Sequence, residues 1–112
     1  MSLRLRPHTV TVEQPTTPTD NAGRKGALVF GAPSTVRGKV EPMTPQTAFA
    51  MFQVDTSQPR RLMVNPADGP AFARVNTRVV WKGQRLRVVS WREFDTGLIP
   101  HWSILLDTEP GA

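Results

Sequence analysis

The sequence contains no cysteine, and this absence excludes several kinds of chemistry. A chain without Cys forms no disulfide, builds no thiolate metal site and has no cysteine nucleophile. The first ten residues, MSLRLRPHTV, carry positive charge but lack the apolar segment of a secretory signal. No apolar run approaches the roughly 20 residues that a membrane helix needs. We therefore expect a soluble protein that makes no membrane contact.

The sequence also lacks the motifs of common catalytic and cofactor sites. His8 and His101 are the two histidines, and they do not have the spacing of metal ligands. The glycine-rich stretch Gly23–Gly31 neither follows an expected strand nor opens a helix, so it does not predict a phosphate-binding loop. Glu93 and Asp95 are close in sequence but precede a turn signal, which is typical of solvated carboxylates. We expect no enzyme, no metal and no cofactor.

Acidic residues are fewer than basic ones. The chain of 112 residues has 9 Asp and Glu against 14 Lys and Arg, which gives a formal net charge of +5. A length of this kind predicts one domain, here residues 1–112. The basic balance favours polyanionic surroundings, but an Arg-rich solvated surface explains it equally well.

Alternation of apolar and polar residues predicts a mainly β protein. Two such runs flank Lys82–Gly83, which is the pattern of a β-hairpin. Short strands with short connections favour a small antiparallel β-barrel or sandwich of about six strands. The expected strands are His8–Gln14, Thr35–Glu41, Arg60–Asn65, Thr77–Trp81, Gln84–Trp91 and His101–Asp107.

One short helix and two irregular stretches complete the expected fold. Thr44 followed by Pro45 is typical of a helix start, and the apolar stripe that continues to Phe52 predicts a helix over Pro45–Gln53. Residues 15–34, rich in Pro and Gly, predict a long flexible loop after the first strand. Pro66–Val75 is expected to be a second connector, and residues 108–112 a frayed tail.

The stretch Thr77–Trp91, TRVVWKGQRLRVVSW, mixes cations with tryptophans and has two interpretations. It resembles a nucleic-acid face, on which Trp81 and Trp91 would stack bases. Strand alternation instead places one set of side chains toward a core and the other toward solvent. The inward set is Leu86, Val88 and Ser90, and the outward set is Arg85, Arg87, Val89 and Trp91. The second interpretation is favoured, and a single-stranded nucleic-acid-binding barrel remains an alternative.

The expected helix is better suited to protein contacts than to DNA. Its sequence, PQTAFAMFQ, carries no charge, whereas a helix that reads bases is usually rich in Arg, Asn or Gln. Its apolar residues extend beyond one stripe, which indicates a second buried side and a partner subunit. The residues predicted to contact that subunit are Pro45, Phe49, Met51 and Phe52.

Three stretches in this order resemble the head–tail joining family of long-tailed phages and phage-like particles, which includes the head-closure or stopper proteins. They are a first strand over Arg6–Pro15, a strand ending in Val40–Pro42 that leads into the helix, and the hairpin over Val79–Val88. The resemblance covers most of the chain. The chain departs from the family pattern in two places: its proline-rich first loop is longer than a plain hairpin, and the Pro66–Val75 connector is also substantial.

The resemblance implies a structural virion protein in the neck between head and tail, made in the host cytoplasm. It implies a small barrel that assembles with copies of itself into a six- or twelve-fold ring, twelve favoured, around the DNA channel. The ring would join portal and adaptor proteins to tail-terminator or tail-tube proteins and retain packaged DNA without sequence preference. A tail-terminator or another neck ring protein is an alternative. The residues expected to face DNA are Arg24, Lys25, Arg60 and Arg61.

Overall fold

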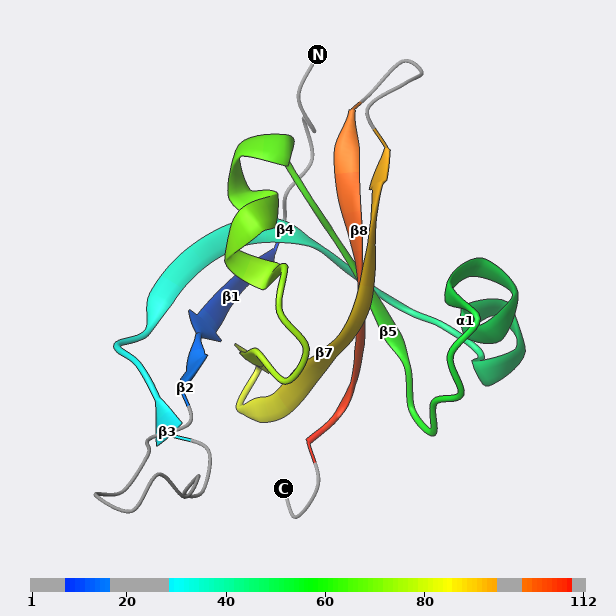
Figure 1. The fold of residues 1–112 in the computed structure, drawn as a ribbon, viewed down its shortest axis with the longest axis horizontal. Helices are drawn as coiled ribbons and strands as arrows, with labels where there is room; N and C mark the ends of the chain where they lie inside the picture. The colour runs from blue at the N-terminus through cyan, green and yellow to red at the C-terminus, as the bar shows by residue number, and fades with distance from the viewer. Residues whose placement is uncertain (1–7, 17–28, 95–99, 110–112) are drawn as a thin grey trace, which may run out of the picture.

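The computed structural model describes residues 8–16, 29–94 and 100–109. Six of the strands in these ranges form a closed antiparallel barrel (Figure 1). The barrel order is β1-β4-β5-β8-β7-β6, and every neighbouring pair is antiparallel. This confirms the predicted mainly β fold and selects the barrel over the sandwich. The six barrel strands are β1 (His8–Glu13), β4 (Ser34–Pro42), β5 (Arg60–Val64), β6 (Arg78–Trp81), β7 (Gln84–Phe94) and β8 (His101–Thr108).

Alternate residues of the strands fill the barrel interior. Each strand contributes branched apolar side chains at every second position, and these side chains lose nearly all contact with water. Leu62 and Val64 point inward as the sequence predicts. The interior cluster consists of Val10, Val12, Val40, Leu62, Val64, Phe72, Val79, Leu86, Val88, Ile104 and Leu106.

The β6–β7 hairpin turns at Lys82 and Gly83, as the sequence predicts. Lys82 has φ 50° and Gly83 has φ 75°, so both central residues are left-handed. Positive φ at both positions defines the turn whose twist matches that of the flanking strands. The hairpin pairs Trp81 with Gln84.

A bulge in β7 corrects the predicted facing of the residues that follow it. Val88 pairs with Leu106, but Ser90 pairs with Leu105, so Val89 is the extra residue. The insertion reverses the alternation, and Trp91 packs against the barrel interior instead of pointing outward with the arginines. Ser90, predicted inward, shares the outer face with its partner Leu105.

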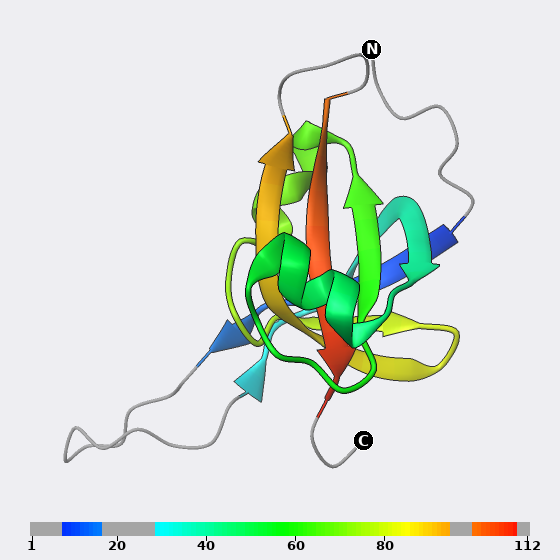
Figure 2. The same ribbon diagram turned by 90° about the vertical axis from the view of Figure 1, so that its right-hand side faces the viewer.

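Helix α1 (Pro45–Phe52) lies on the outside of the barrel, over β8 (Figure 2). Thr44 caps it, because the Thr47 amide donates a 3.1 Å hydrogen bond to the Thr44 hydroxyl. The helix ends one residue before the predicted boundary, since Gln53 adopts the left-handed conformation of a C-cap. Ala48 and Phe52 pack on Leu105 and form a second apolar cluster outside the barrel.

The predicted loop over residues 15–34 is wrong at both of its ends. Strand β2 (Pro15–Thr16) pairs with β3 (Val29–Phe30) in a two-stranded ribbon, and Ser34 already belongs to β4. The Gly31 amide donates to the Gln14 carbonyl at 2.9 Å and continues this pairing toward the barrel. The flexible loop expected between the two strands, residues 17–28, lies outside the described residues.

The second connector is also more ordered than the sequence predicts. Residues Pro66–Phe72 form a 3-10 helix, η1, and Phe72 is fully buried in the barrel interior. Gly69 packs against the Trp102 ring, where a Cβ atom would collide with it. η1 therefore contributes to the core, because the barrel needs an apolar side chain that its strands do not supply.

Two residues of the predicted frayed tail are structured. Thr108 belongs to β8, and the Glu109 amide donates a 3.1 Å hydrogen bond to the Arg85 carbonyl. Strand pairing with β7 fixes both residues, which sequence polarity alone does not reveal. Residues 110–112 lie outside the described residues.

Candidate functional site

The residues predicted to contact a neighbouring subunit divide between the surface and the interior. Phe49 is 53% exposed and Pro45 is exposed, whereas Met51 is half-buried. Phe52 is only 8% exposed because it packs under α1 against Leu105. Phe52 therefore stabilises its own chain. That the exposed residues contact a subunit stays a prediction.

Of the four residues predicted to face DNA, the structure describes Arg60 and Arg61, and it separates them. Arg24 and Lys25 lie outside the described residues. Arg60 and Arg61 are adjacent in β5, so their side chains point to opposite faces of the sheet. Arg61 lies on the outer face, where its Nε and Nη2 donate to the Ser103 hydroxyl at 3.0 and 2.9 Å. Arg60 follows the inward alternation of Leu62 and reaches the end of the barrel.

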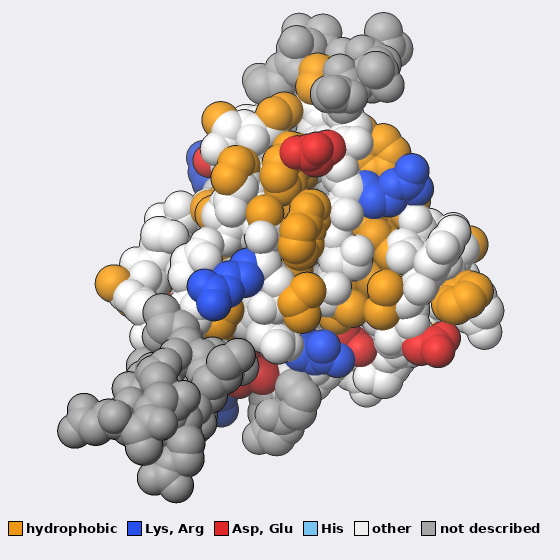
Figure 3. Space-filling view, in the orientation of Figure 1, with side chains coloured by type: hydrophobic (Ala, Val, Ile, Leu, Met, Phe, Trp, Pro, Cys, Tyr) orange, Lys and Arg blue, Asp and Glu red, His pale blue; other side chains and the backbone are white. Residues whose placement is uncertain are grey.

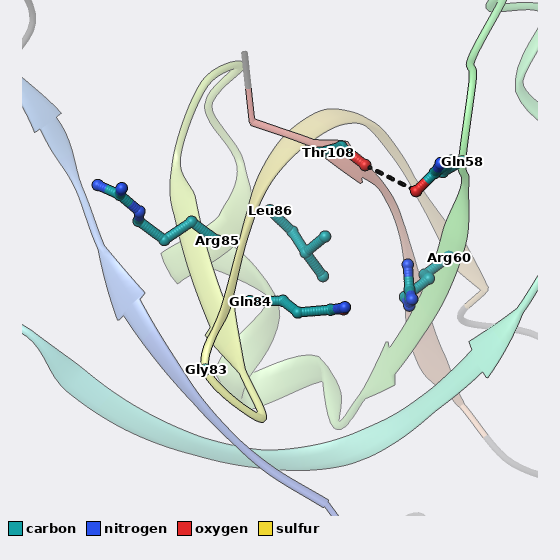
Figure 4. A pocket seen from close by; sticks show the side chains of 7 residues that line it. All are labelled: Gln58, Arg60, Gly83, Gln84, Arg85, Leu86 and Thr108. Atoms are coloured by element: carbon teal, nitrogen blue, oxygen red, sulfur yellow. Dashed lines mark hydrogen bonds between the residues drawn. The ribbon is translucent and has the colours of Figure 1, made fainter. Parts of the chain in front are cut away.

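A pocket of about 240 Å³ opens at this end, and we call it the barrel mouth (Figure 4). Leu86 and Gln84 point into the opening, Arg60 faces them from β5, and the Arg85 side chain points away. Gln58 lies beside Thr108, whose hydroxyl donates a 3.5 Å hydrogen bond to the Gln58 side-chain oxygen. That bond leaves the Gln58 NH2 group as a donor. The lining residues are Gln58, Arg60, Gly83, Gln84, Arg85, Leu86 and Thr108.

Trp81 provides an apolar support for two cations beside the mouth. The Arg60 guanidinium carbon lies 5.8 Å from the centre of the Trp81 ring, and Lys82 Nζ lies 4.8 Å from it. The His8 ring packs edge-on against Trp81 at 5.4 Å, and His8 Nδ1 accepts a 2.9 Å hydrogen bond from the Val40 amide. These contacts hold two positive charges near one indole.

Asp107, which bonds to the mouth residues Gln58 and Thr108, is fully engaged by backbone donors. Asp107 is 4% exposed and accepts backbone hydrogen bonds from Gln58, Ser57 and Thr108 at 3.0, 3.1 and 2.8 Å. Burial acts to raise the pKa of Asp107, but these three donors outweigh it and the pKa is lowered. Among residues 8–16, 29–94 and 100–109, no carboxylate lies within ion-pair distance of Arg60, Lys82 or Arg85. The Asp107–Gln58 bond also fixes Gln58 at the mouth.

The Glu109 carboxylate is engaged by Arg78. The Arg78 Nε and Nη2 atoms each donate a 2.8 Å hydrogen bond to Glu109, and the Arg78 guanidinium lies 3.9 Å from the centre of the Phe30 ring. The hydrogen bonds from Arg78 lower the pKa of Glu109, and the same bonds raise the pKa of Arg78. Glu13 approaches Arg78 at 4.0 Å. Arg78 thus joins β1, β3 and β6 to the end of the chain.

The tryptophans do not form an exposed stacking platform. Trp81 and Trp91 are both partly buried, and both pack against the barrel interior. A stacking surface for bases requires a free aromatic face. On the face drawn in Figure 3, Lys and Arg side chains are scattered singly and do not form one basic patch. The tryptophans that motivated the alternative of a single-stranded nucleic-acid-binding barrel are thus partly covered, and that alternative stays a prediction.

Sequence reasoning missed the amides of the mouth. Gln84 has the same strand parity as Leu86, so alternation could have placed it inward. Gln58 carries no such signal, because its position depends on its bond to Asp107, about 50 residues later in the chain. The sequence indicates Arg60 as a DNA-facing residue through its charge alone, and the structure shows that Gln58 and Gln84 line the same pocket.

No helix in the described part of the chain is long and apolar enough to cross a membrane. Within the same residues, no three His, Asp or Glu side chains gather in a way that could hold a metal ion. Comparison with models of known protein families and with curated proteins finds no match for this chain.

Proposed function

We propose that the protein is a structural subunit of a ring in the neck of a long-tailed phage or phage-like particle, as a head-closure protein. Such a subunit needs a rigid body, a lateral contact surface and no chemistry. The support for the proposal is the strand–helix–hairpin order of the sequence together with the closed barrel that this order builds. A tail-terminator or another neck ring protein is the same class of subunit at a different layer.

The observation that carries the proposal is the placement of α1. The helix is inserted between β4 and β5, lies outside the barrel and buries one side on Leu105. Its other side presents Phe49 at 53% exposure beside a depression lined by Pro45, Gln46 and Asp55. An exposed aromatic side chain on a rigid element is typical of a contact surface.

The ribbon formed by β2 and β3 supports the same proposal. It extends from the barrel, pairs only with itself among the described strands, and is held at its base by the Arg78–Phe30 contact. A rigid barrel with an extending ribbon can contact a layer above or below it while α1 contacts a neighbour beside it. The expected net charge of the ring is a multiple of +5, which attracts DNA without reading its sequence.

Particles that lack the protein test the function directly. We expect filled heads that lose DNA and fail to attach tails, because nothing joins the portal to the tail. Heads that stay full and join tails normally would refute the proposal.

A matched pair of variants tests the contact surface. Phe49→Ser should prevent ring formation, measured by cross-linking and negative-stain microscopy of assembled necks. Val75→Ser is the control, because Val75 is 51% exposed and lies outside α1. Equal assembly of the two variants would exclude α1 as the lateral contact. Thermal unfolding of both variants checks that the barrel remains folded.

A further inference from the structure

We infer that the barrel mouth binds phosphate groups of the DNA backbone. The inference rests on the proposed function for its partner, duplex DNA, but its evidence is the chemistry of the pocket. It assigns the DNA contact to Arg60 with Gln58 and Gln84 in the mouth, and to Lys82 on the neighbouring Trp81 ring.

The inner part of the mouth presents donors that converge on one space. Arg60, Gln84 and Gln58 all line the same pocket of about 240 Å³. The Arg60 side chain makes no hydrogen bond or ion pair with the other described residues, and its stacking on Trp81 leaves its guanidinium N–H groups available. Several N–H donors around one charged guanidinium are the chemistry that binds an oxyanion.

The floor of the mouth strengthens that interaction. Leu86 is 2% exposed and forms an apolar base, and the Trp81 ring lies under Arg60. Apolar walls exclude water and lower the local dielectric, so a charge pair inside the mouth is screened less than one on the open surface. The hydrogen bonds that hold Gln58 and Thr108 to Asp107 fix the pocket before a ligand arrives.

The rim favours a phosphodiester chain over a single carboxylate. Lys82 Nζ lies 4.8 Å from the centre of the same Trp81 ring that Arg60 contacts, whereas the Arg85 side chain points away from the pocket. A lone carboxylate would use only the inner donors. A polyanion places one phosphate at Arg60 and a neighbouring phosphate at Lys82, so both cations contribute. None of these side chains is arranged to read a base edge, so binding is independent of sequence.

The binding test uses the purified chain and a short labelled duplex of mixed sequence. Anisotropy is measured between about 50 and 200 mM salt, the range over which phosphate contacts lose most of their strength. Arg60→Gln should weaken binding about threefold or more at low salt and lower the salt slope by about 0.9, the loss of one phosphate contact. Lys82→Asn should lower the slope by a similar amount.

Two controls separate the mouth from net charge. Arg37→Gln and Arg74→Gln remove the same charge at exposed positions outside the mouth and should change binding little. Equal losses in Arg60→Gln and in these controls would overturn the inference. Gln84→Glu offers a second route, because it leaves the Arg60–Trp81 contact in place and puts a carboxylate opposite Arg60. This variant should weaken binding as much as Arg60→Gln, and unchanged binding would also overturn the inference.

Side-chain amide resonances locate the anion and identify its source. Inorganic phosphate should shift the NMR signals of the Gln58 and Gln84 amides and of the Trp81 indole, and acetate at equal ionic strength should shift them less. Equal shifts with both anions, together with DNA binding that ignores Arg60→Gln, would make the mouth a carboxylate site and refute the DNA assignment. Particle assembly is a separate measurement, so failure here leaves the head-closure proposal to its own test.

Discussion

Replacement of Arg78 by alanine is expected to destabilise the fold and to release the base of the β2–β3 ribbon. Arg78 holds Glu109 by two hydrogen bonds of 2.8 Å, and its guanidinium lies 3.9 Å from the Phe30 ring centre. One side chain therefore ties β6 to the end of the chain and to β3. Removal of the guanidinium breaks both connections.

The expected magnitude follows from the partial burial of this pair. The Arg78 and Glu109 side chains are 18% and 17% exposed, so solvent screens them less than a surface pair. Two charge-assisted hydrogen bonds in this setting contribute about 1.5 kcal/mol, below the range for fully buried pairs. The contact with Phe30 adds about 0.5 kcal/mol. We expect Arg78→Ala to lower the free energy of unfolding by about 2 kcal/mol.

The effect has a defined pH dependence. Hydrogen bonds from Arg78 hold the pKa of Glu109 below its ordinary value in the folded chain. A carboxyl with a lowered folded pKa contributes stability above its unfolded pKa, and this contribution is lost as pH falls through the folded pKa. The stability difference between the native chain and Arg78→Ala should therefore be full at neutral pH and shrink in acid.

Urea unfolding at neutral and acidic pH measures both quantities. Arg78→Lys is the informative companion, because it keeps the charge but loses the two-pronged donor and the flat surface over Phe30. A double-mutant cycle with Glu109→Gln isolates the pair. The reasoning fails if Arg78→Lys is as stable as the native chain, or if the Arg78→Ala difference does not change with pH. Amide signals of Phe30 and Gly31 report the release of the ribbon.

Three further predictions concern the barrel itself. Asp107→Asn should lower the free energy of unfolding by about 2 kcal/mol, because a neutral amide replaces a carboxylate that accepts three backbone hydrogen bonds. Because the fold lowers the pKa of Asp107, the stability difference between the native chain and Asp107→Asn should be present at neutral pH and decline in acid. Gly38→Ala should cost about 2 kcal/mol or prevent folding, since the new Cβ would lie 2.6 Å from the Met63 carbonyl oxygen; normal stability would show that β4 can move away. Lys82→Asn should raise the thermal midpoint through a gain of about 0.5 kcal/mol, because Asn tolerates the φ of 50° that strains Lys; a lower midpoint would contradict this.

Local pattern was enough to predict most of the elements. Where branched apolar residues occupy every second position of a strand, the strand is stable only with that face buried. The inward orientation of Leu62 and Val64 could therefore be predicted from the sequence. The Thr44–Pro45 pair and the Lys82–Gly83 pair define a helix start and a tight turn through their own backbone preferences. These features depend only on residues that are adjacent in the chain, so the sequence is sufficient to predict them.

The errors share one cause, contact between residues far apart in the chain. The β7 bulge depends on pairing with β8, and no local feature of Ser90 or Trp91 predicts it. Phe72 lies in a stretch rich in Pro and Gly, and only the unfilled interior of the barrel accounts for its burial. The sequence predicts that Phe52 contacts a neighbouring subunit, and only the packing of α1 against Leu105 shows that it is buried within its own chain.

The sequence by itself determined the six barrel strands, helix α1, the hairpin turn and the basic balance, because each depends on local backbone preference or on simple composition. Strand alternation alone puts Arg60 and Arg61 on opposite faces of β5. Only the tertiary structure decided that Arg61 meets Ser103, and that Arg60 meets Gln58 and Gln84 at one pocket. Closure of the barrel brings these side chains together, and closure is a property of long-range pairing that no short stretch of the chain contains.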